Sequence, residues 1–365
     1  MSSTTLNDLD TPALIVDLDR LEANIGRMAA VAREGGKALR PHTKTHKTPE
    51  IARMQVAAGA RGITVAKLGE AEVMAGAGFD DIFIANQIVG PIKLERLVPL
   101  AKRARIIVGV DDAGAAQAIA EAAHRAGVTV EVRIEVDTGL RRAGVRTVEA
   151  AADLAATIAE TPGVRLDGLF TYEGHANAGS PEERERTCRA AAEQMRSAAE
   201  AIQKRGIDPG VLSVGSTAGA PTMTTETGIS ELRPGVYVFN DCGQMARGAR
   251  IADCALTVLA TVVSRPDTNT AIIDAGTKAL SGDKGVEGSR HGRLLEDADV
   301  VFDWANEEHG HLNLSGSSFR PRIGDQVRIV PFHACTATNM HDTVHAVRGE
   351  RVEASWNIAG RGRIQ

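Results

Sequence analysis

A regular alternation of strand-like and helix-like segments is the feature that most constrains the fold of this chain. Eight short runs rich in apolar and β-branched residues recur, and most are separated by amphipathic segments rich in Ala, Glu and Arg. Strands that alternate with helices form βα units and a parallel sheet. Eight such units over roughly 220 residues fit a (β/α)8 barrel, which typically takes about 250. The predicted strands are 38–41, 62–67, 81–86, 105–110, 130–136, 165–172, 211–216 and 232–239.

The segments between these strands carry apolar residues at helical spacing. A doubly wound open sheet would show the same alternation of strands and helices. No GxGxxG follows the first strand, however, and this weighs against a dinucleotide-binding fold. We therefore predict the barrel, with helices at 19–34, 70–77, 92–103, 113–126, 147–160 and 181–205.

The pattern changes after about residue 248. Strand-like runs at 255–263, 270–274, 326–331, 343–348 and 350–358 are separated by turns that contain Gly, Asp and Pro, with no long helical pattern between them. This predicts a second, strand-rich domain. The early run 12–17 has no helical partner and is assigned to that domain as well. The predicted domains are a barrel over 18–248 and a β domain formed by 1–17 together with 249–365.

Composition narrows the class of protein. The net charge of the 365-residue chain is −5, and acidic and basic residues are mixed along it, so no nucleic-acid partner is indicated. The first residues lack the basic and apolar segments of a signal peptide, and no apolar stretch is long enough for a membrane span. The four cysteines are scattered and form no CxxC pair. We therefore expect no disulfide framework and a cytoplasmic location.

A basic turn at the end of the first predicted barrel strand singles out one lysine. Residues 40–47, RPHTKTHK, crowd cationic and titratable side chains beside a proline that stiffens the backbone. Crowding by other cations and partial desolvation make a lysine a usable amine nucleophile. We expect Lys44 to be that nucleophile.

Polar and glycine residues gather where the predicted barrel strands end. In a (β/α)8 barrel the chemistry lies at the carboxyl ends of the strands, so these residues are expected at one rim. For any single residue among them, an ordinary surface turn is the alternative. They are His42 and Lys44, Lys67, Asn86 and Gln87, Asp137–Gly139 with Arg141 and Arg142, Tyr172–His175, Gly215–Gly219, and Arg233–Tyr237.

The end of the seventh predicted strand, SVGSTAG, suits a phosphate group. Its small residues allow backbone N–H groups to converge on an anion, and barrels often bind phosphate at the loops after strands seven and eight. Gly215, Ser216 and Thr217, with the backbone of Gly235 and Val236, are the predicted cradle. An ordinary turn is again the alternative. Together with a lysine at strand one, the cradle fits a phosphate-bearing aldehyde, and we expect Lys44 to form an imine with pyridoxal phosphate.

The segment 331–342, PFHACTATNMHD, is a second candidate site. In an extended segment residues i and i+2 face the same side, so His333 and Cys335 are expected to share one ion. Imidazole and thiolate together suit zinc, and two protein ligands leave positions open for substrate and water. A buried core pair is the alternative for so short a motif. Another polar cluster in the same domain is Asn306–His309, for which a solvated turn is the alternative.

Taken in order, these motifs make the chain resemble the D-threonine aldolase/D-serine dehydratase family of fold-type III pyridoxal-phosphate enzymes, which have an alanine-racemase-like barrel. The resemblance covers nearly the whole chain. It implies a barrel followed by a β domain, a homodimer with the active site between domains of both subunits, and Lys44 rather than Lys47 as the cofactor lysine. The motifs are DTPALIVDLDRLEANI, RPHTKTHKTPEIA, EVDTGLRRAGV, GLFTYEGHA, SVGSTAG, ELRPGVYVFND, IIDAGTKAL, NEEHG and HACTATNMHD.

Departures within the family favour one branch. Aldolases of this group usually show HxDP at the metal, QAYxG at the end of strand six and a GGGTGS phosphate loop. This chain has HAC, TYEGH and VGSTAG in their place. These variants resemble the D-serine dehydratase branch, whose metal is zinc held by His and Cys. The expected metal here is therefore zinc at His333 and Cys335, with manganese as the alternative.

The tyrosine count argues against one reaction. An alanine racemase needs a second base on the cofactor face opposite the lysine, normally a tyrosine from the partner's β domain. The only tyrosines of this chain are Tyr172 and Tyr237, and both belong to the predicted barrel. Racemization by that mechanism is therefore disfavoured.

The resemblance also suggests roles for single residues. His175 is expected to be a second acid/base group, and Tyr172 to stack on or cradle the cofactor linkage. Arg142 is expected to face the pyridine nitrogen, and His42 to contact the cofactor. Tyr237 is expected to bond the phosphate, with a buried structural hydroxyl as the alternative.

The predicted function is that of a lyase on small D-β-hydroxy-α-amino acids, dependent on pyridoxal phosphate and a divalent metal. Dehydration of a D-serine or D-threonine type of substrate to a keto acid and ammonia is favoured. Three alternatives stay open: D-threonine aldolase, a non-catalytic pyridoxal-phosphate-binding protein, and a barrel enzyme that uses Lys44 without a cofactor. The dehydratase and the aldolase differ in which substrate bond breaks, and the sequence leaves that choice open.

Overall fold

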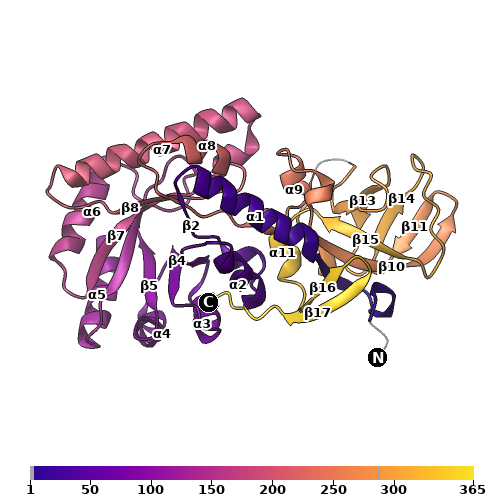
Figure 1. The fold of residues 1–365 in the computed structure, drawn as a ribbon, viewed down its shortest axis with the longest axis horizontal. Helices are drawn as coiled ribbons and strands as arrows, with labels where there is room; N and C mark the ends of the chain where they lie inside the picture. The colour runs from indigo at the N-terminus through magenta and orange to yellow at the C-terminus, as the bar shows by residue number, and fades with distance from the viewer. Residues whose placement is uncertain (1–3, 286–287) are drawn as a thin grey trace. The chain divides into compact units, whose positions relative to one another are not determined.

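The computed structural model describes residues 4–285 and 288–365. Two compact units make up this part of the chain. The barrel unit consists of Arg27–Lys44, Ala52–Gly235 and Arg363–Gln365. The sheet unit consists of the described residues of Met1–Gly26, Thr45–Ile51 and Val236–Gly362. Figure 1 shows the helices and strands of both units, and each unit is described by itself below.

The barrel unit contains the eight parallel strands that the sequence predicts. They pair in the order β2-β9-β8-β7-β6-β5-β4-β3. A parallel bridge between His42 and Thr64 joins the first and last members of this order. The predicted (β/α)8 barrel is confirmed. The strands are β2 (Ala38–Leu39), β3 (Ile63–Val65), β4 (Asp81–Gln87), β5 (Arg105–Val110), β6 (Val130–Glu135), β7 (Val164–Phe170), β8 (Val211–Val214) and β9 (Glu231–Leu232).

Amphipathic helices cover the outside of these strands (Figure 1). Their ends follow local signals: α7 starts with a capping box in which Ser180 and Glu183 bond each other's backbone N–H groups, and Pro181 stands in the first turn. Each predicted helix end lies within two residues of the observed end, the usual uncertainty for helix ends. The helices are α1 (Leu18–Glu34), α2 (Pro49–Ala57), α3 (Leu68–Gly76), α4 (Pro91–Ala101), α5 (Ala113–Arg125), α6 (Val148–Glu160), α7 (Pro181–Gln203) and α8 (Ala220–Thr225).

One predicted strand is much shorter than expected. The run 232–239 was predicted as a strand, but β9 ends at Leu232 and Val236–Val238 form a 3-10 helix, η4. Pro234 explains the early end, because proline has no N–H to donate to a neighbouring strand. The chain passes from the barrel unit to the sheet unit directly after Gly235.

Ion pairs fill part of the barrel interior. The guanidinium groups of Arg40 and Arg133 and the carboxylate of Glu231 are almost fully buried, and both arginines donate to that carboxylate. Burial by itself raises the pKa of Glu231, but the two arginines lower it well below its usual range. Beside them, Phe83 and Phe170 pack edge to face with ring centres 5.0 Å apart. The interior is therefore a packed network of paired charges and aromatic rings.

The sheet unit is built on a nine-stranded sheet in which the N-terminal strand β1 is central. This strand pairs antiparallel with β10 and parallel with β16, and Leu14 lies opposite both Val258 and Val344. The pairing order is β13-β14-β11-β10-β1-β16-β17, with β15 joining β10 and β12. The strands are β1 (Ala13–Asp17), β10 (Leu256–Asp267), β11 (Thr270–Ile273), β12 (Gly292–Leu294), β13 (Val301–Ala305), β14 (Gly310–Asn313), β15 (Gln326–Pro331), β16 (Thr343–Arg348) and β17 (Arg351–Asn357).

Three of these strands, β12, β13 and β14, have no counterpart among the predicted runs. They are three to five residues long and include polar residues, so they show little of the alternation that identifies a strand. The sheet unit also contains the short helices α9 (Cys242–Met245), α10 (Thr277–Leu280) and α11 (Ala334–Thr338).

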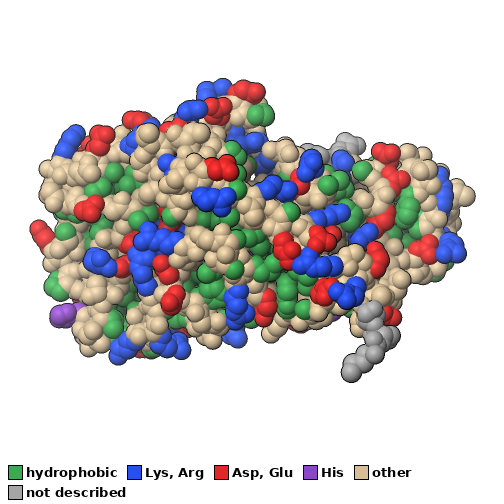
Figure 2. Space-filling model, in the orientation of Figure 1, with side chains coloured by type: hydrophobic (Ala, Val, Ile, Leu, Met, Phe, Trp, Pro, Cys, Tyr) green, Lys and Arg blue, Asp and Glu red, His purple; other side chains and the backbone are tan. Residues whose placement is uncertain are grey.

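Charges of both signs are interspersed over the face of the molecule drawn in Figure 2. This agrees with the mixed acidic and basic sequence. Within residues 4–285 and 288–365, no helix is both long enough and apolar enough to cross a membrane.

Candidate active site

Lys44 lies in a short 3-10 helix, η2 (Thr43–Thr45), directly after the bridge that joins β2 to β3. Its Nζ is 5.7 Å from the centre of the Tyr172 ring, and the guanidinium carbon of Arg142 is 5.3 Å from the same ring centre. The fold therefore brings together three of the residues predicted for the cofactor, from the ends of three different barrel strands.

Two glycines make room for Tyr172 and His175. A Cβ atom on Gly174 would lie 2.3 Å from the Tyr172 ring, and a Cβ on Gly139 would lie 2.9 Å from Nε2 of His175. Gly139 also has a φ of +125°, which disfavours any residue with a side chain. The sequence DTG at the end of β6 thus serves to seat the His175 ring.

Arg142 is placed by a tight turn and a buried carboxylate. In the turn, Oδ1 of Asp137 accepts the N–H groups of Gly139 and Arg141. Arg142 then lies 3.6 Å from Glu135, which also accepts a 2.5 Å hydrogen bond from Gln87. Burial raises the pKa of Glu135, and the bonds from Gln87 and Arg142 only partly oppose this. Glu135 received no role from the sequence, although it ends a barrel strand.

The predicted phosphate loop is backed by a buried carboxylate. Ser216 Oγ accepts the Gly219 N–H at 2.9 Å, which closes the turn. The Gly215 N–H points at Oε2 of Glu173 at 3.3 Å, so this amide already has a carboxylate partner. The other oxygen of Glu173, Oε1, is buried and has no hydrogen-bond partner. Of the predicted cradle, Ser216 and Thr217 therefore stay the candidates for contact with an anion.

Arg233 is a second rim residue for which no specific role was predicted. Its guanidinium donates to Ser213 Oγ at 2.5 Å and to the Thr171 carbonyl at 2.7 Å, above the rings of Phe83 and Phe170. Burial lowers its pKa to about 10, although Glu231 opposes this. It connects the rim to the ion pairs of the barrel interior. An arginine at the end of a barrel strand could have been predicted as a site residue, because a charged side chain is rarely buried there without several acceptors.

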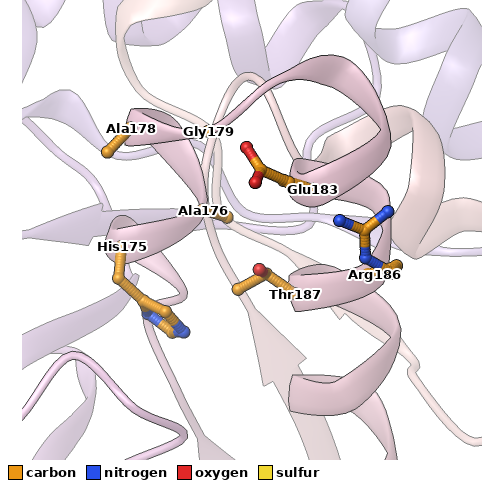
Figure 3. Close-up of a pocket in the computed structure, with 7 residues that line it drawn as sticks. All are labelled: His175, Ala176, Ala178, Gly179, Glu183, Arg186 and Thr187. Atoms are coloured by element: carbon orange, nitrogen blue, oxygen red, sulfur yellow. The ribbon is translucent and has the colours of Figure 1, made fainter.

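A cavity of about 370 Å³ opens beside His175, between η3 (Gly174–Ala178) and the first turns of α7. Figure 3 shows the His175 ring on one side of it and the Glu183 and Arg186 side chains on the other. Nδ1 of His175 is buried and has no hydrogen-bond partner. The lining residues are His175, Ala176, Ala178, Gly179, Glu183, Arg186 and Thr187.

The pair His333 and Cys335 comes together, but not in the way the sequence predicted. The extended segment ends at His333, which is the N-cap of α11, and Cys335 lies in the first turn of that helix. The expectation of two residues on one face of a strand is therefore wrong. The side chains nevertheless interact: burial lowers the pKa of His333, but hydrogen bonds to Asp241 and Cys335 raise it to about 10.

Two further residues of the sheet unit hold this pair. Asp241 Oδ2 lies 3.1 Å from Nδ1 of His333 and also accepts the Ala334 N–H at 2.9 Å. Thr45 Oγ1 lies 3.2 Å from the sulfur of Cys335. Both contacts join residues far apart in the chain, so no local pattern pointed to them.

The cluster Asn306–His309 does not contribute further ligands and is the turn that the sequence offered as the alternative. The carbonyls of Asn306 and Glu307 accept the N–H groups of Thr277 and Lys278, and Glu308 pairs with the Lys278 amine at 2.7 Å. In the described part of the chain, no three His, Cys, Asp or Glu side chains are grouped so that they could hold a metal ion. His333 and Cys335 are therefore the two proposed ligands within the described part of this chain.

Four predicted residues remain, two in the barrel unit and two in the sheet unit. His42 forms the bridge that joins β2 to β3, and Gly235 is the last residue of the barrel-unit segment Ala52–Gly235. Val236 and Tyr237 lie in η4 of the sheet unit, where Tyr237 is buried. Their roles at the cofactor stay predictions.

The residues present fit both groups that the sequence implies. For pyridoxal phosphate, a lysine, a tyrosine ring and an arginine adjoin at the rim, and buried polar atoms of Glu173 and His175 lack partners. For a divalent metal, the imidazole and thiol suit zinc, and two ligands leave tetrahedral positions open.

Comparisons with known proteins identify relatives over nearly the whole chain. The family model described as "Alanine racemase, N-terminal domain" matches residues 16–242, and that described as "Putative serine dehydratase domain" matches residues 255–347. D-threonine aldolase of Arthrobacter sp. is 37% identical, over 97% of this chain and 93% of its own length. D-threo-3-hydroxyaspartate dehydratase of Delftia sp. is 36% identical, over 96% and 98%. D-serine dehydratase of Dictyostelium discoideum is 26% identical, over 94% and 95%.

Solved structures give the same picture. The crystal structure of D-threonine aldolase from Filomicrobium marinum has a TM-score of 0.95 at 34% identity and covers 100% of this chain and 99% of its own. Two structures of the D-threo-3-hydroxyaspartate dehydratase carry alanine in place of a histidine and of a cysteine two residues further on. They have TM-scores of 0.89 and 0.87 at 35% identity, cover 97% of this chain and 96% and 98% of their own, and the cysteine variant is described as metal-free.

Proposed function

The chain belongs to the alanine-racemase-like, fold-type III family of pyridoxal-phosphate-dependent enzymes, in the group of D-amino acid lyases, and we propose that it dehydrates a D-β-hydroxy-α-amino acid to a keto acid and ammonia. The proposal rests on one observation above the others. His333 and Cys335 are two residues apart, Asp241 faces the first and Thr45 the second, and two solved structures of D-threo-3-hydroxyaspartate dehydratase carry alanine at a histidine and at a cysteine with the same spacing.

Lys44 is proposed to hold the cofactor and to move a proton at the substrate Cα. When bound, pyridoxal phosphate withdraws electrons and so weakens the bonds to that carbon. The Tyr172 ring and Arg142 lie within 6 Å of one another at this point and orient the bound groups. Ser216 and Thr217 are proposed to bind the phosphate, with Gly235, Val236 and Tyr237 as the remaining predicted contacts.

His333 and Cys335 are proposed to act on the substrate hydroxyl. A divalent metal, when bound, serves there as a Lewis acid that makes the hydroxyl a better leaving group. Asp241 accepts from Nδ1 of His333, which leaves Nε2 of the ring to face a ligand. His175 is proposed as the second acid/base group, since Nδ1 of its ring has no partner in the structure.

Retro-aldol cleavage to glycine and an aldehyde is the second candidate function. The favourable observation is the 37% identity to D-threonine aldolase of Arthrobacter sp. and the TM-score of 0.95 to the Filomicrobium marinum enzyme. In that reaction His175 would remove the proton of the substrate hydroxyl as the Cα–Cβ bond breaks. Both reactions would use the same rim residues and the same metal pair. They differ in which substrate bond breaks.

Turnover with product identification tests the proposal. The enzyme would be assayed with D-threonine, D-serine and D-threo-3-hydroxyaspartate, with and without added zinc or manganese. A keto acid and ammonia support dehydration, whereas glycine and an aldehyde identify an aldolase. Cofactor binding without turnover of any of these substrates would leave a pyridoxal-phosphate-binding protein as the remaining function.

We also propose that the chain forms a homodimer, as its family resemblance implies. Val89 and Ile92 expose apolar side chains, 63% and 73% accessible, just beyond the carboxyl end of β4. Light scattering on the purified protein tests this. A monomer mass across the concentration range of the assay would overturn it.

A further inference from the structure

We propose that Asp241 and Thr45 are positioning residues for the metal pair, Asp241 acting through His333 and Thr45 through Cys335. The inference rests on the proposed metal at His333 and Cys335. It concerns two side chains that do not touch the metal; both lie within the quoted motifs, but no role was predicted for either.

Asp241 is built into the fold around His333. It is buried, and its two oxygens are fully used: Oδ1 accepts the Gln244 N–H at 2.8 Å, and Oδ2 accepts the Ala334 N–H at 2.9 Å and faces His333 Nδ1 at 3.1 Å. Asp241 is the N-cap of α9, while His333 is the N-cap of α11. One carboxylate thus ties the two helix starts together.

This geometry selects one nitrogen of the His333 ring for the metal. A carboxylate only accepts, so Nδ1 carries the proton that faces Asp241, and Nε2 is the nitrogen that gives its lone pair to a metal once the ring is neutral. Carboxylate partners of this kind fix the orientation of metal-bound histidines and make them better ligands. The His333 side chain is 41% exposed, so its outer edge is open to an ion while its inner edge is held.

Thr45 acts on the other ligand in a comparable way. Its hydroxyl lies 3.2 Å from the Cys335 sulfur, and it is buried. A metal-bound cysteine is a thiolate with no proton to give, so in the loaded protein the hydroxyl must be the donor. Thr45 directly follows Lys44 in the chain, so the same short segment carries the cofactor lysine and the thiolate partner.

Metal affinity measured by competition with a chromophoric chelator tests the proposal. Asp241→Asn is expected to weaken zinc binding about 10- to 100-fold, the range found when such outer partners are removed. Asp112→Asn is the matched control, because Asp112 caps α5 through the Ala115 N–H, a role comparable to that of Asp241 in α9. Its zinc affinity should equal that of the unaltered protein.

Cobalt substitution supplies the readout for Thr45 and stays informative if Asp241→Asn fails to fold. The thiolate-to-cobalt absorbance band should shift in Thr45→Val, which loses the donor, and should return in Thr45→Ser. Thr338→Val is the control, since that buried hydroxyl bonds the Ala334 carbonyl. The absorbance of bound pyridoxal phosphate should be unchanged in all of these variants.

The outcomes separate this inference from the proposed function. If the unaltered protein binds neither zinc nor cobalt, the metal role of His333 and Cys335 fails first. If it binds them and Asp241→Asn binds zinc equally well, the role of Asp241 is overturned. An unchanged cobalt band in Thr45→Val overturns the role of Thr45.

Discussion

The cluster around Lys44 and the pair His333 and Cys335 are supported in different ways. Behind the Lys44 cluster, the barrel unit holds a continuous network of buried ion pairs, in which Glu231 alone serves two arginines. Around the pair in the sheet unit, one carboxylate and one hydroxyl provide the contacts. The comparison suggests that changes in the barrel interior cost folding stability, whereas changes around the pair cost ligand binding.

Lys44→Ala should produce the largest effect. Turnover should fall by more than about 10³-fold, because the change removes the group proposed to bind the cofactor covalently and to move protons. The absorbance of bound pyridoxal phosphate should be lost as well, and both are measured on the same sample. Lys47→Ala is the control, because Lys47 bonds Asn339 at 2.8 Å and should leave that absorbance intact. If the absorbance is lost in Lys47→Ala and kept in Lys44→Ala, Lys47 and not Lys44 binds the cofactor.

Glu231→Gln should come next, as a loss of stability. It leaves the buried Arg40 and Arg133 without their shared charge, and breaking a buried pair typically costs about 3–5 kcal/mol in the free energy of unfolding. Urea unfolding measures this. Glu185→Gln removes an exposed pair with Arg189 and should cost no more than about 1 kcal/mol. Equal losses of unfolding free energy in the two variants would contradict a larger contribution of the buried barrel network to stability.

The same carboxylate predicts a dependence of stability on pH. The pKa of Glu231 is lower in the folded protein than its ordinary value of 4.5. Its contribution is therefore complete above about pH 4.5 and is lost as the pH falls further, because the unfolded chain takes up the proton first. Unfolding measured from pH 6 to pH 3 should show a steep acid loss that is shallower in Glu231→Gln. Equal slopes would assign the acid loss to other carboxylates.

Removing the proposed metal ligands should reduce activity without affecting cofactor binding. Cys335→Ala and His333→Ala are expected to lose bound metal and more than about 10²-fold in turnover, since a Lewis acid supplies several kcal/mol. Metal content and cofactor absorbance are measured together. Cys254→Ala, a buried cysteine of the same unit, is the control. Full turnover after complete removal of metal by a chelator would exclude the metal from the reaction.

Glu173→Ala should have the smallest effect. It removes the acceptor of the Gly215 N–H behind the phosphate loop, which is worth about 1 kcal/mol, or roughly fivefold in affinity for pyridoxal phosphate. Titration of the metal-loaded apoenzyme with the cofactor measures it. Glu173→Gln retains an acceptor and should recover most of the affinity. If it binds as weakly as the alanine variant, the charge matters rather than the hydrogen bond.

Local patterns were enough to predict most of the architecture. The alternation of strands and helices identified all eight barrel strands, since each buried strand reads as an apolar run. The basic turn around Lys44 and the glycine-rich loop at Gly215 lie at strand ends, where a barrel collects its chemistry. The prediction was wrong in two places. Pro234 ended the last barrel strand early, and the segment predicted to stay extended beyond His333 forms a helix instead.

The sequence by itself therefore determined the barrel and the central strand β1 as part of the sheet, and it proposed a lysine and a His-x-Cys pair as the chemical groups. Tertiary structure decided what surrounds them. The contact of Asp241 with His333 spans 92 residues and that of Thr45 with Cys335 spans 290. Glu173 reaches Gly215 across 42 residues. Periodicity reports only neighbours along the chain, so partners this far apart are set by how the strands and helices pack.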